Sequence, residues 1–295
     1  MDPIVNAMTI DVEDYFHVSV FDGVVPRSRW DWLETRVCAN TEKLLAIFDE
    51  TRIQGTFFVL GWVAERWPHL VRQIAERGHE IASHGFGHRL VYDQTPRQFR
   101  EDVRRAKALL EAAAGTQVFG YRAPSYSITP RSLWALDVLI EEGFRYDASI
   151  FPVHHDRYGI PVSARHPYRI ERESGALWEA PASTVRCGPM NLPVAGGGYF
   201  RILPYAWTRW GIARLNRVER RPAIFYLHPW EIDPDQPRLK AGTLSRFRHY
   251  RNLDRTEARL RSLLRDFQFG PLLSVFAAAD PCDAPSAALA LPYYW

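Results

Sequence analysis

The sequence predicts an α/β protein with a largely parallel sheet, of the (β/α) barrel type. Short β-rich apolar runs alternate along the chain with longer segments of helical periodicity. In addition, polar side chains stand at the ends of several predicted strands, namely Asp11, His84, Arg122, Asp147 and His228. The carboxyl ends of barrel strands converge on the face that carries the active site, so these residues are expected to meet there.

The elements of the first half follow from apolar periodicity and from the residues that interrupt it. Strands are predicted at residues 5–12, 56–60, 80–83, 118–121 and 144–147. Helices are predicted at residues 42–50, 62–77, 96–115 and 130–143, each with apolar residues on one face. The third helix has a clear start, because Thr95 can act as its N-cap, Pro96 as its first residue and Gln98 as the partner that completes a capping box.

The alternation is interrupted at residues 151–203, which are rich in Pro and Gly and end in Gly196-Gly197-Gly198. This stretch is expected to be an insertion or long loop over the site, with β-like pieces at 168–171 and 177–180. Beyond it we expect a helix at 204–220, a strand at 223–227, a helix at 256–267 capped by Thr256, and a last strand at 272–276. Residues 1–295 are therefore interpreted as one domain, with an insertion at 151–203 and a C-terminal extension at 233–295.

Composition excludes several classes of protein. The net charge of +3, from 37 basic and 34 acidic residues, argues against a nucleic-acid-binding protein, and the basic run at 246–251 is expected to be a solvated surface. Cys38, Cys187 and Cys282 lack CxxC spacing, which argues against a disulfide framework and a cysteine metal site. No signal peptide or apolar segment of about 18 residues is visible, so a cytoplasmic protein without a transmembrane segment is expected.

Histidines and carboxylates suggest a metal site. His84 and His88 lie four apart in a glycine-rich loop, and a carboxylate cluster of Asp11, Glu13 and Asp14 ends the first strand. Imidazole plus carboxylate is the ligand set of zinc or a similar metal, and three ligands would leave a position open, as in hydrolytic sites. Strand alternation favours Glu13 as the carboxylate ligand, since it shares a face with Asp11, whereas a turn after Asp11 favours Asp14. The alternative is a pair of surface histidines beside a solvated acidic turn.

Two further strand-end residues have a clear use beside such a site. One carboxylate could bind the metal while another takes a proton from water. Arg122 could pair with that base, orient it and keep it ionised, and His228 could protonate a leaving group. The alternatives are a structural cation for Arg122 and a hydrogen-bonded core histidine for His228.

Together these residues resemble the metal-dependent polysaccharide deacetylases of the NodB-homology type, carbohydrate esterase family four. The resemblance covers about residues 5–150 and resumes at about 222–232. His84 and His88 stand where the family has its metal-binding histidine pair. The third, fourth and fifth family motifs resemble Arg122-Ala123-Pro124, Tyr146-Asp147-Ala148-Ser149 and Leu227-His228.

The resemblance implies a distorted barrel of about seven strands that hydrolyses N-acetyl groups of amino sugars and releases acetate. By position, Asp11 would be the base, Arg122 its orienting partner and His228 the general acid, with Asp147 tuning His228. A divalent metal, in the first place zinc, and backbone N–H groups near Ser125 would hold the oxyanion.

The sequence departs from the family pattern in the first motif, where Asp-Val-Glu-Asp replaces two adjacent aspartates, and at Ser125, where the family commonly has Tyr. The segments 11–17, 196–201 and 228–233 resemble a subgroup with an extra C-terminal domain, found with exopolysaccharide and exosortase systems. The expected substrate is therefore an N-acetylated sugar of a bacterial exopolysaccharide or its precursor. Two alternatives remain: a metal-independent hydrolase of a small amide or ureide, and a non-catalytic carbohydrate-binding subunit.

Overall fold

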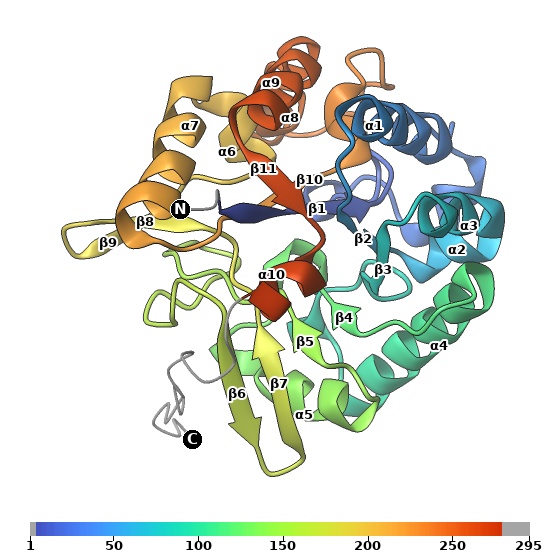
Figure 1. Ribbon diagram of the computed structural model, residues 1–295. Helices are drawn as coiled ribbons and strands as arrows, with labels where there is room; N and C mark the ends of the chain where they lie inside the picture. The colour runs from blue at the N-terminus through green and yellow to red at the C-terminus, as the bar shows by residue number, and fades with distance from the viewer. Residues whose placement is uncertain (1–3, 279–295) are drawn as a thin grey trace.

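In the computed structural model, which describes residues 4–278, a nine-stranded sheet curves through the molecule and helices surround it (Figure 1). The strands of this sheet are β1 (Val5–Val12), β2 (Thr56–Val59), β3 (Glu80–Ser83), β4 (Gly120–Tyr121), β5 (Tyr146–Asp147), β6 (Tyr168–Arg172), β7 (Gly175–Glu179), β10 (Ile224–Leu227) and β11 (Gln268–Gly270). Their order is β10-β1-β2-β3-β4-β5-β7-β6, and β11 pairs with β1. All neighbours from β10 to β7 are parallel, so the predicted α/β class is confirmed.

Helices lie around the sheet. They are α1 (Val37–Thr51), α2 (Gly61–Arg66), α3 (Pro68–Glu76), α4 (Pro96–Ala114), α5 (Trp134–Glu141), α6 (Gly197–Ile202), α7 (Tyr205–Arg214), α8 (Thr243–Tyr250), α9 (Leu253–Asp266) and α10 (Leu272–Ala278). The central strands are buried on both faces, which explains why they are continuous apolar runs rather than alternating ones. The predicted capping box at the start of α4 is present.

The sheet is a distorted barrel whose edges meet irregularly. Seven parallel strands run from β10 to β7, and the chain after β7 then approaches β10. There the backbone N–H of Ser183 donates to the Ile224 carbonyl oxygen at 3.3 Å, and the Ile224 N–H donates to the Ser183 Oγ atom at 2.7 Å. These two bonds connect the edges without a regular strand pair.

The register of the parallel strands brings their carboxyl ends to one face. Val12 lies opposite Val59, Val59 opposite Ser83, and Ser83 opposite Tyr121. The residues that follow these strands therefore emerge side by side, which is the arrangement that the strand-end pattern predicts.

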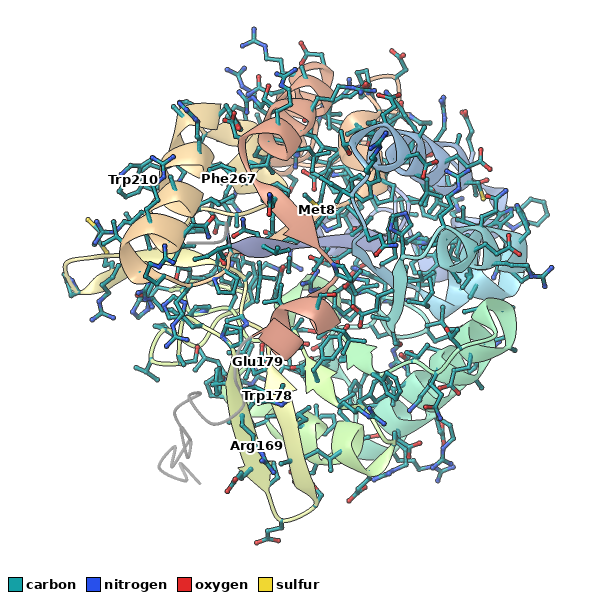
Figure 2. All side chains as sticks on the ribbon, viewed as in Figure 1. Met8, Arg169, Trp178, Glu179, Trp210 and Phe267 are labelled. Carbon is teal, nitrogen blue, oxygen red and sulfur yellow. The ribbon has the colours of Figure 1, made fainter. Side chains whose placement is uncertain are left out.

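The opposite face of the barrel is covered by α10, where the sequence predicted a strand at 272–276, and that prediction is wrong. Leu272 and Val275 are both buried, and their spacing of three residues is helical rather than alternating. The Leu272 N–H donates to the Thr56 Oγ1 atom at 2.7 Å, at the start of β2. Trp178 of β7 lies beside α10 (Figure 2), and its ring centroid is 5.8 Å from that of Phe276.

Several helix boundaries differ from the expected ones. The helix expected at 62–77 is divided into α2 and α3, because Pro68 starts a new helix after the non-helical Trp67. Thr256 does not cap α9: it lies in the first turn and donates to the Asn252 carbonyl oxygen at 2.9 Å. The basic run at 246–251 lies largely in α8, and its His249 is buried rather than solvated.

The segment 151–203 contributes to the barrel as well as to its rim. It supplies β7, which pairs with β5, the antiparallel partner β6, a hairpin of β8 (Thr184–Cys187) and β9 (Met190–Pro193), and α6. In the described part of the chain no helix has the length and apolar character to cross a membrane. Cys38 and Cys187 are free thiols, whereas Cys282 and the end of the expected C-terminal extension lie outside the described residues.

Candidate metal centre and active site

Three buried side chains meet at the carboxyl ends of β1 and β3: Glu13, His84 and His88. One ligand atom of each lies within 4.8 Å of the other two. The His88 Nε2 atom is 2.7 Å from the Glu13 Oε2 atom, and the His84 Nε2 atom is 4.0 Å from the same oxygen. Two imidazole nitrogens and one carboxylate oxygen suit zinc and similar divalent metals, so this group is able to hold a metal ion.

The loop that carries His88 is held by two side chains from outside it. The Asp102 carboxylate of α4 accepts a hydrogen bond from the Phe86 N–H at 2.7 Å. The Arg27 guanidinium donates to the carbonyl oxygens of Gly87 at 2.8 Å and of His88 at 3.0 Å. His88 has a left-handed backbone with φ of 49°, an uncommon conformation for a residue with a side chain. Contacts from α4 and from the segment before α1 therefore impose the geometry of the histidine loop.

The protonation states of this group also suit a cation. His84 donates from Nδ1 to the Arg122 carbonyl oxygen at 2.8 Å, which leaves the Nε2 lone pair facing Glu13. Burial lowers the pKa of His84 to about 4, so the ring is neutral at neutral pH. Burial acts to raise the pKa of Glu13, but the neighbouring histidines, His88 first, outweigh it and hold that pKa well below its usual range. The Oε2 atom of Glu13 is buried and faces both histidine rings, which places it where a metal ion held by all three residues would lie.

Asp14, the other candidate ligand, lies apart from this group and stabilises the fold. Its Oδ2 atom accepts hydrogen bonds from the backbone N–H groups of Arg36 at 2.7 Å and Val37 at 3.0 Å, at the start of α1. Its Oδ1 atom accepts one from the Tyr15 N–H at 2.9 Å. Both oxygens are thus engaged by the backbone, and the expectation of Asp14 as a metal ligand is corrected: the carboxylate that reaches the histidines is that of Glu13.

Asp11 and Arg122 form a buried ion pair beside the three-residue group. The Arg122 Nη1 atom donates to the Asp11 Oδ1 atom at 2.7 Å and to the Thr9 Oγ1 atom at 2.8 Å, and the Nε atom donates to the Ala148 carbonyl oxygen at 3.2 Å. The guanidinium also lies over the Phe58 ring at 4.1 Å. These contacts hold the Asp11 carboxylate in one orientation, with its Oδ2 atom directed away from Arg122.

His228 lies across from this ion pair. Its Nε2 atom is 3.8 Å from the Asp11 Oδ2 atom and 3.7 Å from the Glu13 Oε1 atom. Its Nδ1 atom is 2.5 Å from the Glu231 Oε1 atom. Burial acts to lower the pKa of His228, but the hydrogen bond and charge of Glu231 and the charges of Glu13 and Asp11 raise it to about 9. The imidazole is therefore protonated at neutral pH and able to act as an acid.

Asp147 does not contact His228 in the structure, so the expectation that it tunes this histidine is corrected. Its carboxylate accepts a hydrogen bond from the Ser149 hydroxyl and lies beside the buried carboxyl group of Glu179, its neighbour across the β5–β7 pair. Burial raises the pKa of Asp147 to about 6. The residue that contacts the Nδ1 atom of His228 is Glu231, three positions further along the chain.

Sequence reasoning missed two residues of the site, although both lie next to His228. Glu231 takes the place expected for Asp147, and Trp230 donates from Nε1 to the Glu13 Oε1 atom at 3.1 Å. The available signal was the spacing of His228 and Glu231, which form a capping box at the start of a short 3₁₀ helix, Pro229–Ile232.

Aromatic rings border the site next to His228. The Tyr226 ring lies 5.9 Å from the His228 ring and 5.2 Å from Tyr126. Tyr126 belongs to a short 3₁₀ helix after Arg122, Pro124–Tyr126, in which Ser125 has φ of 52°. Tyr158 and Tyr199 come from the segment 151–203 and meet through their hydroxyl groups at 3.2 Å. Tyr126 and Tyr226 are buried, and Tyr158 and Tyr199 pack against them partly exposed, so these rings form an apolar wall beside His228.

Comparisons with known proteins agree with this geometry. Residues 31–140 match the family described as polysaccharide deacetylase, and residues 148–277 match a domain of unknown function, DUF3473. A peptidoglycan deacetylase of Helicobacter pylori is 27% identical over 114 residues, 39% of this chain and 37% of that protein. A peptidoglycan deacetylase-like protein of Gibberella zeae is 32% identical over 148 residues, 49% of this chain and 42% of that protein. The chain thus spans less than half the length of these curated relatives.

The fold is also found among solved structures. A crystal structure of a candidate polysaccharide deacetylase from Mycobacterium smegmatis superposes with a TM-score of 0.65 at 22% identity, covering 100% of both chains. At this identity the likeness concerns the fold, which is the distorted barrel of these proteins. Residues 31–140 of the chain are thus similar to the polysaccharide deacetylase family, and the fold of the chain agrees with that similarity.

Proposed function

We propose that this protein is a metal-dependent deacetylase that hydrolyses N-acetyl groups of amino sugars. The observation that carries the proposal is the position of a buried base, Asp11, and a protonated histidine, His228, beside a group of two histidines and a glutamate. The His228 Nε2 atom lies 3.8 Å from the Asp11 Oδ2 atom. A base and an acid at this distance, next to a cation site, are the parts that amide hydrolysis needs.

In this proposal Glu13, His84 and His88 hold a divalent metal, with zinc as the first choice. When bound, the metal would polarise the acetyl carbonyl and lower the pKa of water. Asp11 accepts a proton at Oδ2, since its Oδ1 atom is occupied by Arg122. Arg122 holds that carboxylate in its orientation through the hydrogen bond at 2.7 Å.

The remaining steps belong to His228 and to the backbone. His228 donates its Nε2 proton to the leaving nitrogen, because the tetrahedral intermediate cannot expel that nitrogen as an anion at neutral pH and releases it as a neutral amine once it is protonated. The Ser125 backbone N–H is the donor that we assign to the developing oxyanion, because the N–H groups of Tyr126 and Ser127 donate to the carbonyl oxygens of Ala123 and Pro124. The positively charged His228 also offsets the two carboxylates that face it, Asp11 and Glu13.

For the substrate we propose an N-acetylated sugar of a bacterial exopolysaccharide or its precursor, bound by a domain spanning residues 1–295. The relatives are named as deacetylases of peptidoglycan, a polymer of N-acetylated sugars. Tyr199, from the segment 151–203, packs against the cluster of Tyr126 and Tyr226 and is partly exposed, so we propose it as the ring that stacks on a sugar. The similarity of segments 11–17, 196–201 and 228–233 to the exopolysaccharide subgroup supports this choice.

The test is acetate release from N-acetylglucosamine oligomers by zinc-loaded and chelator-treated protein, with Asp11→Asn alongside. We expect release that needs both the metal and Asp11. Equal release after chelation would favour a metal-independent amide or ureide hydrolase. If the folded, zinc-loaded protein binds the oligomer but releases no acetate, the non-catalytic binding subunit is the better account.

A further inference from the structure

Glu231 is a fully buried carboxylate between two cationic partners. Its Oε1 atom is 2.5 Å from the His228 Nδ1 atom and accepts the His228 backbone N–H at 3.2 Å. Its Oε2 atom accepts a hydrogen bond from the Arg201 Nε atom at 2.5 Å, and the exposed fractions of the Arg201 and Glu231 side chains are 3% and 0%. A carboxylate buried to this degree is tolerated only when its charge is compensated, and here both oxygens are engaged by cations.

Arg201 is itself anchored by the C-terminal part of the chain. Its Nη1 atom donates to the carbonyl oxygens of His249 at 2.7 Å and Arg251 at 3.2 Å. Asn252 donates from its side chain to the Arg201 carbonyl oxygen at 2.7 Å. The position of Glu231 is thus determined through Arg201 of α6, which is held by the junction of α8 and α9. These elements lie outside the loop that carries His228.

The contact at Nδ1 determines where the other ring nitrogen points. With Nδ1–H directed at Glu231, the Nε2 atom faces the Asp11 and Glu13 carboxylates at 3.8 Å and 3.7 Å. The ring cannot rotate away without breaking the bond at 2.5 Å and losing its parallel contact with Trp230, at 5.1 Å between centroids and 20° between planes. A second residue that binds one ring nitrogen commonly sets the tautomer and orientation of a functional histidine.

We propose that Glu231 is the positioning residue of His228, in the place that the family resemblance assigned to Asp147. This inference rests on the proposed deacetylase function, in which His228 is the acid. Glu231 accepts the Nδ1–H of His228 and thereby orients the ring, so that the Nε2 atom is presented to the leaving amine.

The test replaces Glu231 with Gln, which preserves the size of the side chain and removes its charge. With an N-acetylglucosamine oligomer as substrate, we expect kcat to fall by about 10²–10³-fold with KM nearly unchanged, because only proton donation to the leaving amine is impaired. With 4-nitrophenyl acetate, whose phenolate leaving group needs no proton, the same variant should lose less than about tenfold. A general structural defect would lower both rates together.

Glu219 provides a matched control. It pairs with the Arg165 Nη2 atom at 2.6 Å and with the His166 Nε2 atom at 3.2 Å, so Glu219→Gln removes the same kind of Arg–Glu–His contact. It lies before β10, at the opposite end of that strand from His228. We expect Glu219→Gln to leave both rates unchanged.

A second readout does not depend on turnover. In the zinc-loaded wild type, the Nδ1-bound proton of His228 should give a low-field NMR resonance, assigned by its absence from His228→Asn. We expect this resonance to be lost in Glu231→Gln and retained in Glu219→Gln. Its persistence in Glu231→Gln, or equal kcat for that variant and wild type on the oligomer, would overturn the role of Glu231 and leave the deacetylase intact. Absence of acetate release from wild type, with the resonance pattern as expected, would instead overturn only the proposed function.

Discussion

Replacing each of the two acidic residues that follow Val12 in turn distinguishes the residue proposed to bind the metal from the residue that stabilises the fold. Glu13→Gln removes the carboxylate whose Oε2 atom is 2.7 Å from His88, and leaves a neutral side chain of the same size. Loss of a residue that merely supports a ligand costs about 10–100-fold in metal affinity, so loss of a direct ligand is expected to cost at least that much. A tenfold loss corresponds to about 1.4 kcal/mol.

Asp14→Ala should have the opposite effect, a loss of stability without a loss of zinc affinity. It removes an acceptor of three backbone hydrogen bonds, from Tyr15, Arg36 and Val37. At about 0.5–1.5 kcal/mol for each bond, and with about 1 kcal/mol typical for a lost helix cap, the expected destabilisation is about 2–3 kcal/mol. The zinc affinity of the folded protein should remain close to that of wild type, since Asp14 lies outside the three-residue group.

Both variants are compared by competitive zinc titration against a chelating dye and by thermal melting of the zinc-free protein. We expect Glu13→Gln to lose affinity without a fall in melting temperature, and Asp14→Ala to melt earlier with its affinity preserved. Loss of zinc affinity in Asp14→Ala equal to that in Glu13→Gln, at an unchanged melting temperature, would refute the assignment of the ligand.

Three further predictions concern stability. Burial lowers the pKa of His79 from 6.5 to about 4, so as the pH falls the unfolded state binds the extra proton first. The contribution of this residue to the free energy of unfolding is complete above pH 6.5 and falls by on the order of 3 kcal/mol as the pH approaches 4. The variant His79→Asn can still accept the Gly55 N–H, and its melting temperature should depend less on pH than that of wild type. Gly196→Ala should cost at least about 2 kcal/mol in chemical denaturation, because Gly196 has φ of 103° and a Cβ atom there would lie 2.2 Å from the Tyr226 carbonyl oxygen. Leu272→Ala should cost about 2–5 kcal/mol by the same assay, since this buried side chain covers the amino-terminal end of the barrel; an unchanged midpoint would contradict the packing of α10.

The sequence predicted those parts of the fold that local pattern controls. Val5–Val12 is a strand with carboxylates at its end because eight residues of β-compatible character stop at a polar cluster, and the capping box at Thr95 marks the start of α4. The run 272–276 was mistaken for a strand because a short apolar segment has no decisive period on its own. Its helical form depends on burial against the ends of β2 and β3, which only the tertiary structure supplies.

The same limit explains the two corrections in the site. Asp14 is engaged by backbone groups 22 and 23 residues away, at the start of α1, and no local pattern announces that contact. Asp147 follows its strand as the family motif leads one to expect, yet β7 brings Glu179 next to it. The strand β7, which pairs with β5, comes from the segment 151–203, which the sequence suggested was mainly a loop. The spacing of residues along the chain cannot predict contacts that depend on how such a segment folds back onto the sheet.

The altered first motif still places two carboxylates at the histidine loop and at Arg122, and strand geometry explains how. Val12 separates Asp11 from Glu13 and is itself buried in the apolar core, so the two carboxylates lie on the same side of β1. Glu13 thereby reaches the histidines while Asp11 meets Arg122. The segment after β10 contacts both the histidine–glutamate group and His228. Trp230 donates a hydrogen bond to Glu13, and Glu231 is bonded to the His228 ring. Because one short 3₁₀ helix contacts both Glu13 and His228, a displacement of this helix would change both residues. The proposed cation site and the proposed proton donor therefore form a single structural unit.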